Sequence, residues 1–98
     1  MSLPVTFHRA ASVELVEASV WYETKRVGLA LDFMAEIDRC VSLASNHPLQ
    51  FAVVREDIRR VVVNRFPYCV YFRAEHHRIV VLAVFHGRRD PVIWQARA

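Results

Sequence analysis

A histidine and two arginines lie close together near the C-terminus, in the segment His86-Gly87-Arg88-Arg89-Asp90. The planar fork of an arginine side chain suits phosphate and carboxylate groups. Histidine titrates near neutral pH, so His86 could transfer a proton beside a bound anion. We therefore treat His86 as a candidate catalytic residue and Arg88 and Arg89 as candidate anion contacts. The alternative for His86 is a hydrogen-bonded side chain at a strand end.

Charge is divided unevenly along the chain. Residues 1–54 hold four basic and six acidic side chains, a net charge of −2, whereas residues 55–98 hold nine arginines and four acids, a net charge of +5. The second half therefore predicts a basic groove for an anionic partner, either nucleic acid or an acidic peptide. A solvated basic surface is the alternative. The candidate target or nucleic-acid contacts are Arg59, Arg60, Arg65, Arg73, Arg88 and Arg89.

The adjacent pair His76-His77 could suggest a metal site. Neighbouring residues on a strand point to opposite faces, and no cluster of cysteine or carboxylate side chains stands nearby to complete the ligand set. The pair is more typical of a solvated turn. The sequence also has no glycine-rich phosphate loop. We expect no metal and no cofactor.

The first half of the chain predicts a strand and two helices. Apolar residues alternate over Leu3–His8, which is typical of a half-buried strand, and Pro4 suggests either an edge position or the first residue of the strand. Apolar residues then recur every three or four positions over Ala10–Arg26 and again over Leu29–Asn46. Because the gap between these helices is short, they should form an antiparallel hairpin.

The first helix carries more apolar residues than one buried face needs. Val13, Val16 and Val20 form a second row, and Trp21 flanks it. Either the helix is buried on two sides, or this row is a ridge that contacts a partner protein or a second copy of the chain. A small domain has little spare interior, so we favour the contact surface.

The second half predicts three strands, at Ile58–Asn64, Tyr68–Arg73 and Arg78–Phe85. The last strand is apolar on both faces, which suits a central position. By alternation His86 should point to the same side as Val84 and Leu82.

Beyond the last strand, Asp90 should cap a short turn and pair with an arginine, Pro91 should begin that turn, and Trp94 should pack on the sheet. One of Arg88 and Arg89 should reach a partner. The residues that we interpret as structural are Phe66, Pro67, Tyr68, Asp90, Pro91 and Trp94.

These elements predict a single α+β domain over residues 1–98. A strand, a helical hairpin, a three-stranded antiparallel sheet and a short C-terminal turn or helix should form two layers. No stretch has the roughly 18 apolar residues of a membrane-spanning helix, and Met1 to Arg9 contains no apolar core of signal-peptide length. We therefore expect a cytoplasmic protein with no membrane contact.

The order and spacing of several short motifs resemble the RelE/ParE superfamily of toxins from type II toxin–antitoxin modules. The resemblance covers nearly the whole chain and implies a RelE/ParE-like two-layer fold. The motifs are Trp21-Tyr22-Glu23, Gly28-Leu29 with Phe33 and Ile37, Asn46-His47-Pro48, Arg59-Arg60, Phe66-Pro67-Tyr68 with Val70 and Phe72, Val84-Phe85-His86, and Arg88-Arg89-Asp90-Pro91 with Trp94.

The resemblance implies a toxin that arrests growth and is neutralised by a cognate antitoxin protein. The toxin–antitoxin complex would bind operator DNA indirectly, through the antitoxin. Some members of the superfamily cleave messenger RNA at the ribosome, and the ParE-like members poison DNA gyrase.

Two departures favour gyrase poisoning here. Members that cleave RNA use lysines and arginines of the sheet and a tyrosine near the C-terminus, but this chain has no lysine after Lys25, and Trp94 stands where the tyrosine would be. Indole has no useful acid or base function. The alternatives are a ribosome-dependent messenger RNA endoribonuclease that uses His86, and a degenerate, non-toxic member that only binds its antitoxin.

Overall fold

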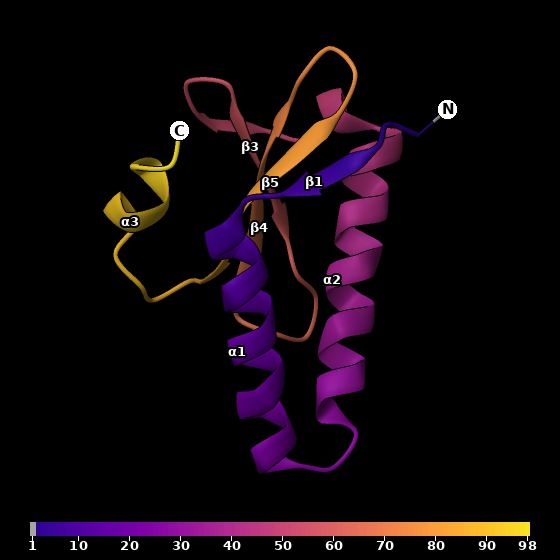
Figure 1. Cartoon of the computed structure of the whole chain (residues 1–98), viewed down its shortest axis with the longest axis vertical. Coiled ribbons are helices and arrows are strands. Elements are labelled where there is room, and N and C mark those ends of the chain that lie inside the picture. Colours follow the sequence, from indigo (N-terminus) through magenta and orange to yellow (C-terminus); the bar gives the residue numbers. More distant parts are fainter. Residues whose placement is uncertain (1) are drawn as a thin grey trace.

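A five-stranded mixed sheet forms the centre of the molecule in the computed structural model, which describes residues 2–98. Its strand order is β1-β5-β4-β3-β2 (Figure 1). Strand β1 pairs in parallel with β5, and the other neighbours are antiparallel. The strands are β1 (Val5–Phe7), β2 (Val53–Arg55), β3 (Ile58–Val62), β4 (Tyr68–Ala74) and β5 (Ile79–His86).

The α+β class and the three long strands are confirmed, but the predicted strand count of the sheet is wrong. The N-terminal strand joins the same sheet in parallel, because the helical hairpin provides a long crossover between β1 and the strands that follow. Strand β2 was missed because its three residues are too few to show an alternating pattern, and its register with β3 is irregular. The edge position expected near Pro4 is confirmed.

The two long helices, α1 (Arg9–Lys25) and α2 (Leu29–Asn46), form the predicted hairpin and lie side by side in Figure 1. The bounds of α2 agree with the prediction. Between the helices Gly28 has a φ of 88°, which favours glycine, and the carboxylate of Glu23 accepts bonds from the backbone N–H groups of Gly28 and Ala30. A short 3-10 helix, η1 (Pro48–Gln50), follows α2.

Aromatic rings form the centre of the core between the helices and the sheet. Phe33 of α2 lies 5.1 Å from Tyr22 of α1, 5.1 Å from Phe66 and 5.0 Å from Tyr68, measured between ring centroids. Offset and edge-on contacts of this kind stabilise beyond simple burial. This cluster connects α1 and α2 to the turn before β4, and so it positions Tyr68 beside α1.

The opposite face of the sheet is covered by the short helix α3 (Val92–Gln95). Trp94 of α3 is buried and stacks on Tyr71 of β4, with 4.1 Å between ring centroids. It also packs with Leu82 and Phe85 of β5. Figure 1 shows α3 set apart from α1 and α2, so the C-terminal segment passes from the end of β5 to the other side of the sheet.

A β-bulge changes the alternation along β5. Tyr71 pairs with Ala83 and Phe72 pairs with Val81, so Leu82 is the extra residue. The expectation that His86 shares a face with both Val84 and Leu82 is therefore half wrong. Val84 belongs to the core under the helices, whereas Leu82 packs with Trp94 on the opposite face. No helix within residues 2–98 is long and apolar enough to cross a membrane.

Candidate functional site

A groove of about 680 Å³ lies beside α1, at the side where the C-terminal segment returns to the sheet. This volume is in the range of ligand-binding clefts. The groove combines small or apolar side chains of α1 with charged side chains from both ends of the chain. Its lining residues are His8, Arg9, Ala10, Val13, Glu14, Glu17, Ala18, Trp21, Tyr68, Arg89 and Arg97.

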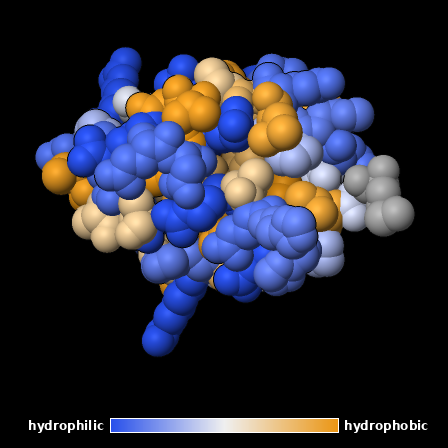
Figure 2. Space-filling model, turned by 90° about the horizontal axis from the view of Figure 1, so that it is seen from above, coloured by the Kyte–Doolittle hydropathy of each residue, from blue (hydrophilic) through white to orange (hydrophobic). Residues whose placement is uncertain are grey.

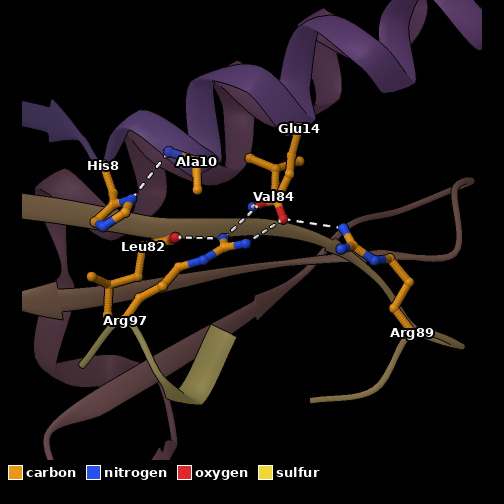
Figure 3. Close-up of polar contacts among 7 residues, drawn as sticks. All are labelled: His8, Ala10, Glu14, Leu82, Val84, Arg89 and Arg97. Carbon is orange, nitrogen blue, oxygen red and sulfur yellow. Dashed lines mark hydrogen bonds and ion pairs between the residues drawn. The ribbon is translucent and has the colours of Figure 1, made fainter. Parts of the chain in front are cut away.

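Glu14 organises the polar side of this groove (Figure 3). Its carboxylate accepts hydrogen bonds from the backbone N–H of Val84 at 3.1 Å and from Arg89 Nη1 at 3.1 Å. Arg97 donates two further bonds to it, from Nη1 at 2.9 Å and from Nη2 at 2.8 Å. Charge-assisted bonds are stronger than neutral ones, so Glu14 holds α1, the middle of β5 and the C-terminal segment together.

The two arginines on Glu14 differ in exposure. The side chain of Arg97 is 12% exposed and also donates to the backbone carbonyl of Leu82 at 3.0 Å, so it is held from two directions. The side chain of Arg89 is 45% exposed, and its guanidinium lies 4.4 Å from the ring centroid of Phe85. Arg97 is therefore a fixed part of the structure, whereas Arg89 lies at the solvent-accessible wall of the groove.

Tyr68 brings a hydroxyl group to the same groove. Burial raises the pKa of Tyr68, and the nearby charge of Arg89 partly opposes that rise. The phenol therefore stays protonated at neutral pH and can donate a hydrogen bond.

His86 lies at the end of β5, where its ring is 5.2 Å from the ring of Tyr68. Its Nδ1 atom accepts a hydrogen bond from the backbone N–H of Arg88 at 3.0 Å. In the neutral imidazole the proton must then be on Nε2, so the remaining nitrogen is a donor. This arrangement makes His86 a poor general base as long as the turn is formed.

The six candidate arginines do not converge on one groove. Arg59 donates to the carbonyl of Phe51 at 2.7 Å, and Arg73 pairs with Asp57 at 3.1 Å. Arg65 lies 3.6 Å from Asp32 at the start of α2. Arg59 and Arg73 thus occupy neighbouring positions of β3 and β4 but point to opposite faces of the sheet, whereas Arg65 lies apart from both in the turn after β3.

The other three arginines are placed differently. Arg60 is exposed and points away from the helical layer, because its neighbours in β3 alternate between the two faces. Arg88 is exposed. Among the six arginines, all within residues 2–98, only Arg89 lines the groove beside α1. The extended basic surface suggested by the charge pattern is thus divided into separate positions.

The second apolar row of α1 lies on the surface. Val13 is 48% exposed, Val16 62%, Val20 61% and Trp21 54%, so these residues are not core within this chain. Val13 and Trp21 also line the groove, and Lys25 lies 4.7 Å above the Trp21 ring. Because Val13 and Trp21 belong to both, the ridge and the groove form one continuous surface along α1. Seen from above in Figure 2, apolar patches interrupt the polar surface at that end of the molecule.

The residues interpreted as structural are placed as follows. Phe66 and Trp94 are buried, and Tyr68 is partly buried at the edge of the aromatic cluster. The side chain of Asp90 accepts a bond from the N–H of Val92 at 3.0 Å, so it caps α3, with Pro91 just before the first helical residue. Pro67 is exposed in the turn between β3 and β4. The expected ion pair of Asp90 is not found within residues 2–98.

Sequence reasoning missed Glu14 and Arg97, which carry the strongest polar contacts of the site. Glu14 lies three residues after buried Ala11, at the border of the buried face of α1. Its partners are 70 and 83 positions away in sequence. An acid at the border of an apolar stripe was the available signal, but its partners could not be inferred from sequence alone.

The sheet with a helical hairpin on one face and a C-terminal helix on the other is a fold found in a solved structure. The solved structure of a chromosomal ParDE TA system from P. aeruginosa has a chain similar to this one, with a TM-score of 0.75 and 19% sequence identity. The similarity covers 87% of this chain and 96% of that chain, and at this identity it shows the shared fold alone.

Residues 5–91 match the family described as the ParE toxin of the type II toxin–antitoxin system parDE. The chain therefore belongs to this family, which confirms the resemblance to the RelE/ParE superfamily and implies an antitoxin partner. No curated protein sequence matches the chain significantly.

Proposed function

We propose that this toxin arrests growth by poisoning DNA gyrase, and that a cognate antitoxin neutralises it in the cytoplasm. The observation that carries the choice of target is the hydrogen bonding of the His86 ring. The Nδ1 atom of His86, the one histidine beside the arginine pair, already accepts a hydrogen bond from the Arg88 backbone, so this atom is not free to act as the base. The match to the ParE family supports the same target.

RNA cleavage without a metal needs a base for the 2′-hydroxyl, cations for the phosphate and an acid for the leaving oxygen. The indole of Trp94 is buried against Tyr71 and supplies neither acid nor base. Arg73 is paired with Asp57, and Arg89 lies in the groove beside α1, which we assign to the antitoxin. Arg60 and Arg88 are exposed, and we assign the contact with the target to these two arginines.

The surface along α1 supports a separate contact with the antitoxin. Val13, Val16, Val20 and Trp21 offer exposed apolar area beside a groove, which is typical of a helix or an extended segment docking on a helical hairpin. The antitoxin would cover this surface in the complex. Operator DNA would be bound by the antitoxin part of that complex and not by this chain.

The target is tested with purified toxin, purified gyrase and supercoiled plasmid. We expect inhibition of supercoiling and accumulation of cleaved plasmid with gyrase attached. Arg88→Ala should reduce both effects, whereas Arg78→Ala, at the opposite end of the sheet, should not.

Induced expression of the toxin in cells distinguishes gyrase poisoning from the two alternative functions. Cuts at defined positions in translated messages, lost in His86→Ala, would establish a ribosome-dependent nuclease and refute gyrase poisoning. Normal growth of induced cells, together with tight binding of the antitoxin, would establish a degenerate, non-toxic member.

A further inference from the structure

We propose that the groove beside α1 binds a carboxylate side chain of the antitoxin and that Arg89 is the residue that receives it. This inference rests on the proposed neutralisation by an antitoxin. Its basis is that two guanidinium groups share one acid: Arg89 Nη1 and Arg97 Nη2 both contact Glu14 Oε2, at 3.1 and 2.8 Å. One carboxylate balances one guanidinium, so the cluster retains a positive charge.

That excess charge is located at Arg89. Arg97 makes two bonds to Glu14 and one to the Leu82 carbonyl, and its side chain is 12% exposed. Arg89 makes one bond to Glu14 and is 45% exposed at the groove wall. An incoming carboxylate can therefore bind Arg89 while Arg97 continues to neutralise Glu14. The other guanidinium nitrogens of Arg89 also allow it to keep Glu14 and bind a second acid at the same time.

The rest of the groove indicates what accompanies the carboxylate. Tyr68 lines the same groove as Arg89, and its protonated phenol can give a carboxylate a second donor. Ala10, Val13, Ala18 and Trp21 provide an apolar wall along α1. The fitting ligand is thus an aspartate or glutamate next to an aliphatic or aromatic side chain, as on one face of an amphipathic helix.

The charges of the lining favour an acidic peptide over nucleic acid. Arg9, Arg89 and Arg97 contribute +3, Glu14 and Glu17 contribute −2, and the sum is +1 with His8 neutral. A single carboxylate matches this charge. A phosphate backbone would bring several negative charges close to Glu14 and Glu17, and like charges at short range are unfavourable.

The test uses the antitoxin encoded beside the toxin gene, with toxin recovered from the co-expressed complex. The dissociation constant is measured for the native toxin, Arg89→Gln and the matched control Arg88→Gln, which removes the adjacent exposed arginine outside the groove. We expect Arg89→Gln to weaken binding at least about tenfold and to reduce its salt dependence. Arg88→Gln should change the affinity less than about twofold, and Arg89→Lys should retain part of the affinity because it keeps the charge.

The acidic residues of the antitoxin are then changed one at a time to their amides. One of these changes should weaken the binding of the antitoxin to native toxin but cause no further loss of affinity for the Arg89→Gln toxin. The antitoxin residue that behaves in this way carries the carboxylate that binds Arg89. If the melting temperature of the Arg89→Gln toxin equals that of the native toxin, Arg97 alone is sufficient to keep Glu14 in place.

Several results would overturn the inference. The first is an equal loss of antitoxin affinity in Arg88→Gln and Arg89→Gln. The second is that no acidic residue of the antitoxin shows coupling to Arg89. The third is that Arg89→Gln binds the antitoxin normally but no longer arrests growth, which would assign Arg89 to the target instead. In each of them the native toxin still binds its antitoxin, so the proposed neutralisation stands. If the native toxin does not bind the neighbouring gene product at all, both proposals fail.

Discussion

Replacing Glu14 by glutamine should destabilise the protein more than any other single change of charge on α1. The side chain of Glu14 is 11% exposed and accepts bonds from Val84, Arg89 and Arg97. Glutamine keeps one acceptor oxygen, but its NH₂ group then faces N–H donors. The side chain of Arg97, 12% exposed, would lose its counter-charge.

The expected cost follows from that uncompensated charge. Removing one partner of a buried ion pair costs about 3–5 kcal/mol, and we take the lower end, about 3 kcal/mol, because the pair is not completely buried and Arg89 is half exposed. A domain of this size loses roughly 4–8 °C of melting temperature for each kcal/mol. Glu14→Gln should therefore melt roughly 12–24 °C below the native protein.

Urea and thermal denaturation followed by circular dichroism would measure this loss. Glu17→Gln is the matched control, because Glu17 is exposed, is on the same helix and lines the same groove. It should change the stability by no more than about 0.5 kcal/mol. The double variant Glu14→Gln, Arg97→Gln should lose less than the sum of the two single variants, since it removes both charges. The account of Glu14 is refuted if its variant melts like the control, or if the double variant shows full additivity.

Three further predictions concern α1 and its connection to α2. Val16→Glu should leave the free energy of unfolding within about 0.5 kcal/mol of the native value, because Val16 is exposed, but should weaken antitoxin binding in a titration; an unfolded monomer would contradict this. Gly28→Ala should lower the free energy of unfolding, measured by denaturation, by about 1–2 kcal/mol, because the φ of 88° disfavours a residue with a Cβ atom even though that atom would meet no other within 4 Å. An unchanged free energy of unfolding would mean that the loop can adopt another conformation. Backbone bonds from Gly28 and Ala30 lower the pKa of Glu23, so its carboxylate stabilises the fold above the usual value of about 4.5, and this contribution is lost as pH falls below it. The stability difference between native protein and Glu23→Gln should therefore shrink on acidification from pH 6 to pH 3, and a constant difference would exclude this role.

The parts of the fold that sequence could predict are those set by local patterns. The stripe of apolar residues in α2 gave the bounds of that helix correctly. Strand β2 and the parallel pairing of β1 have no such signal, because three residues show no period and parallel register depends on the crossover. The bulge at Leu82 could not be predicted either, because every residue of this segment is apolar and no change of alternation shows in the sequence, although the bulge decides which side chains reach α3.

The candidate site shows the same division. The exposed ridge of Val13, Val16 and Val20 was predicted because it is a surplus of apolar residues on one helix. The Glu14–Arg97 pair was missed because it joins residues 83 positions apart. Arg89 was selected for its chemistry, but its position relative to Arg88 depends on the turn formed after His86.

The position of the Glu14–Arg97 pair also limits how a partner can bind. Strand β1 ends at Phe7 opposite Val81, so β5 continues beyond it with an uncovered edge. Glu14 accepts from the N–H of Val84 and Arg97 donates to the carbonyl of Leu82, so two side chains take the hydrogen bonds that a neighbouring strand would make. A partner strand could pair there only by breaking a largely buried ion pair, which is costly. Contact beside this part of β5 is therefore favoured through side chains that enter the groove, and the outer edges of the two edge strands, β1 and β2, are the places at which a partner strand could extend the sheet.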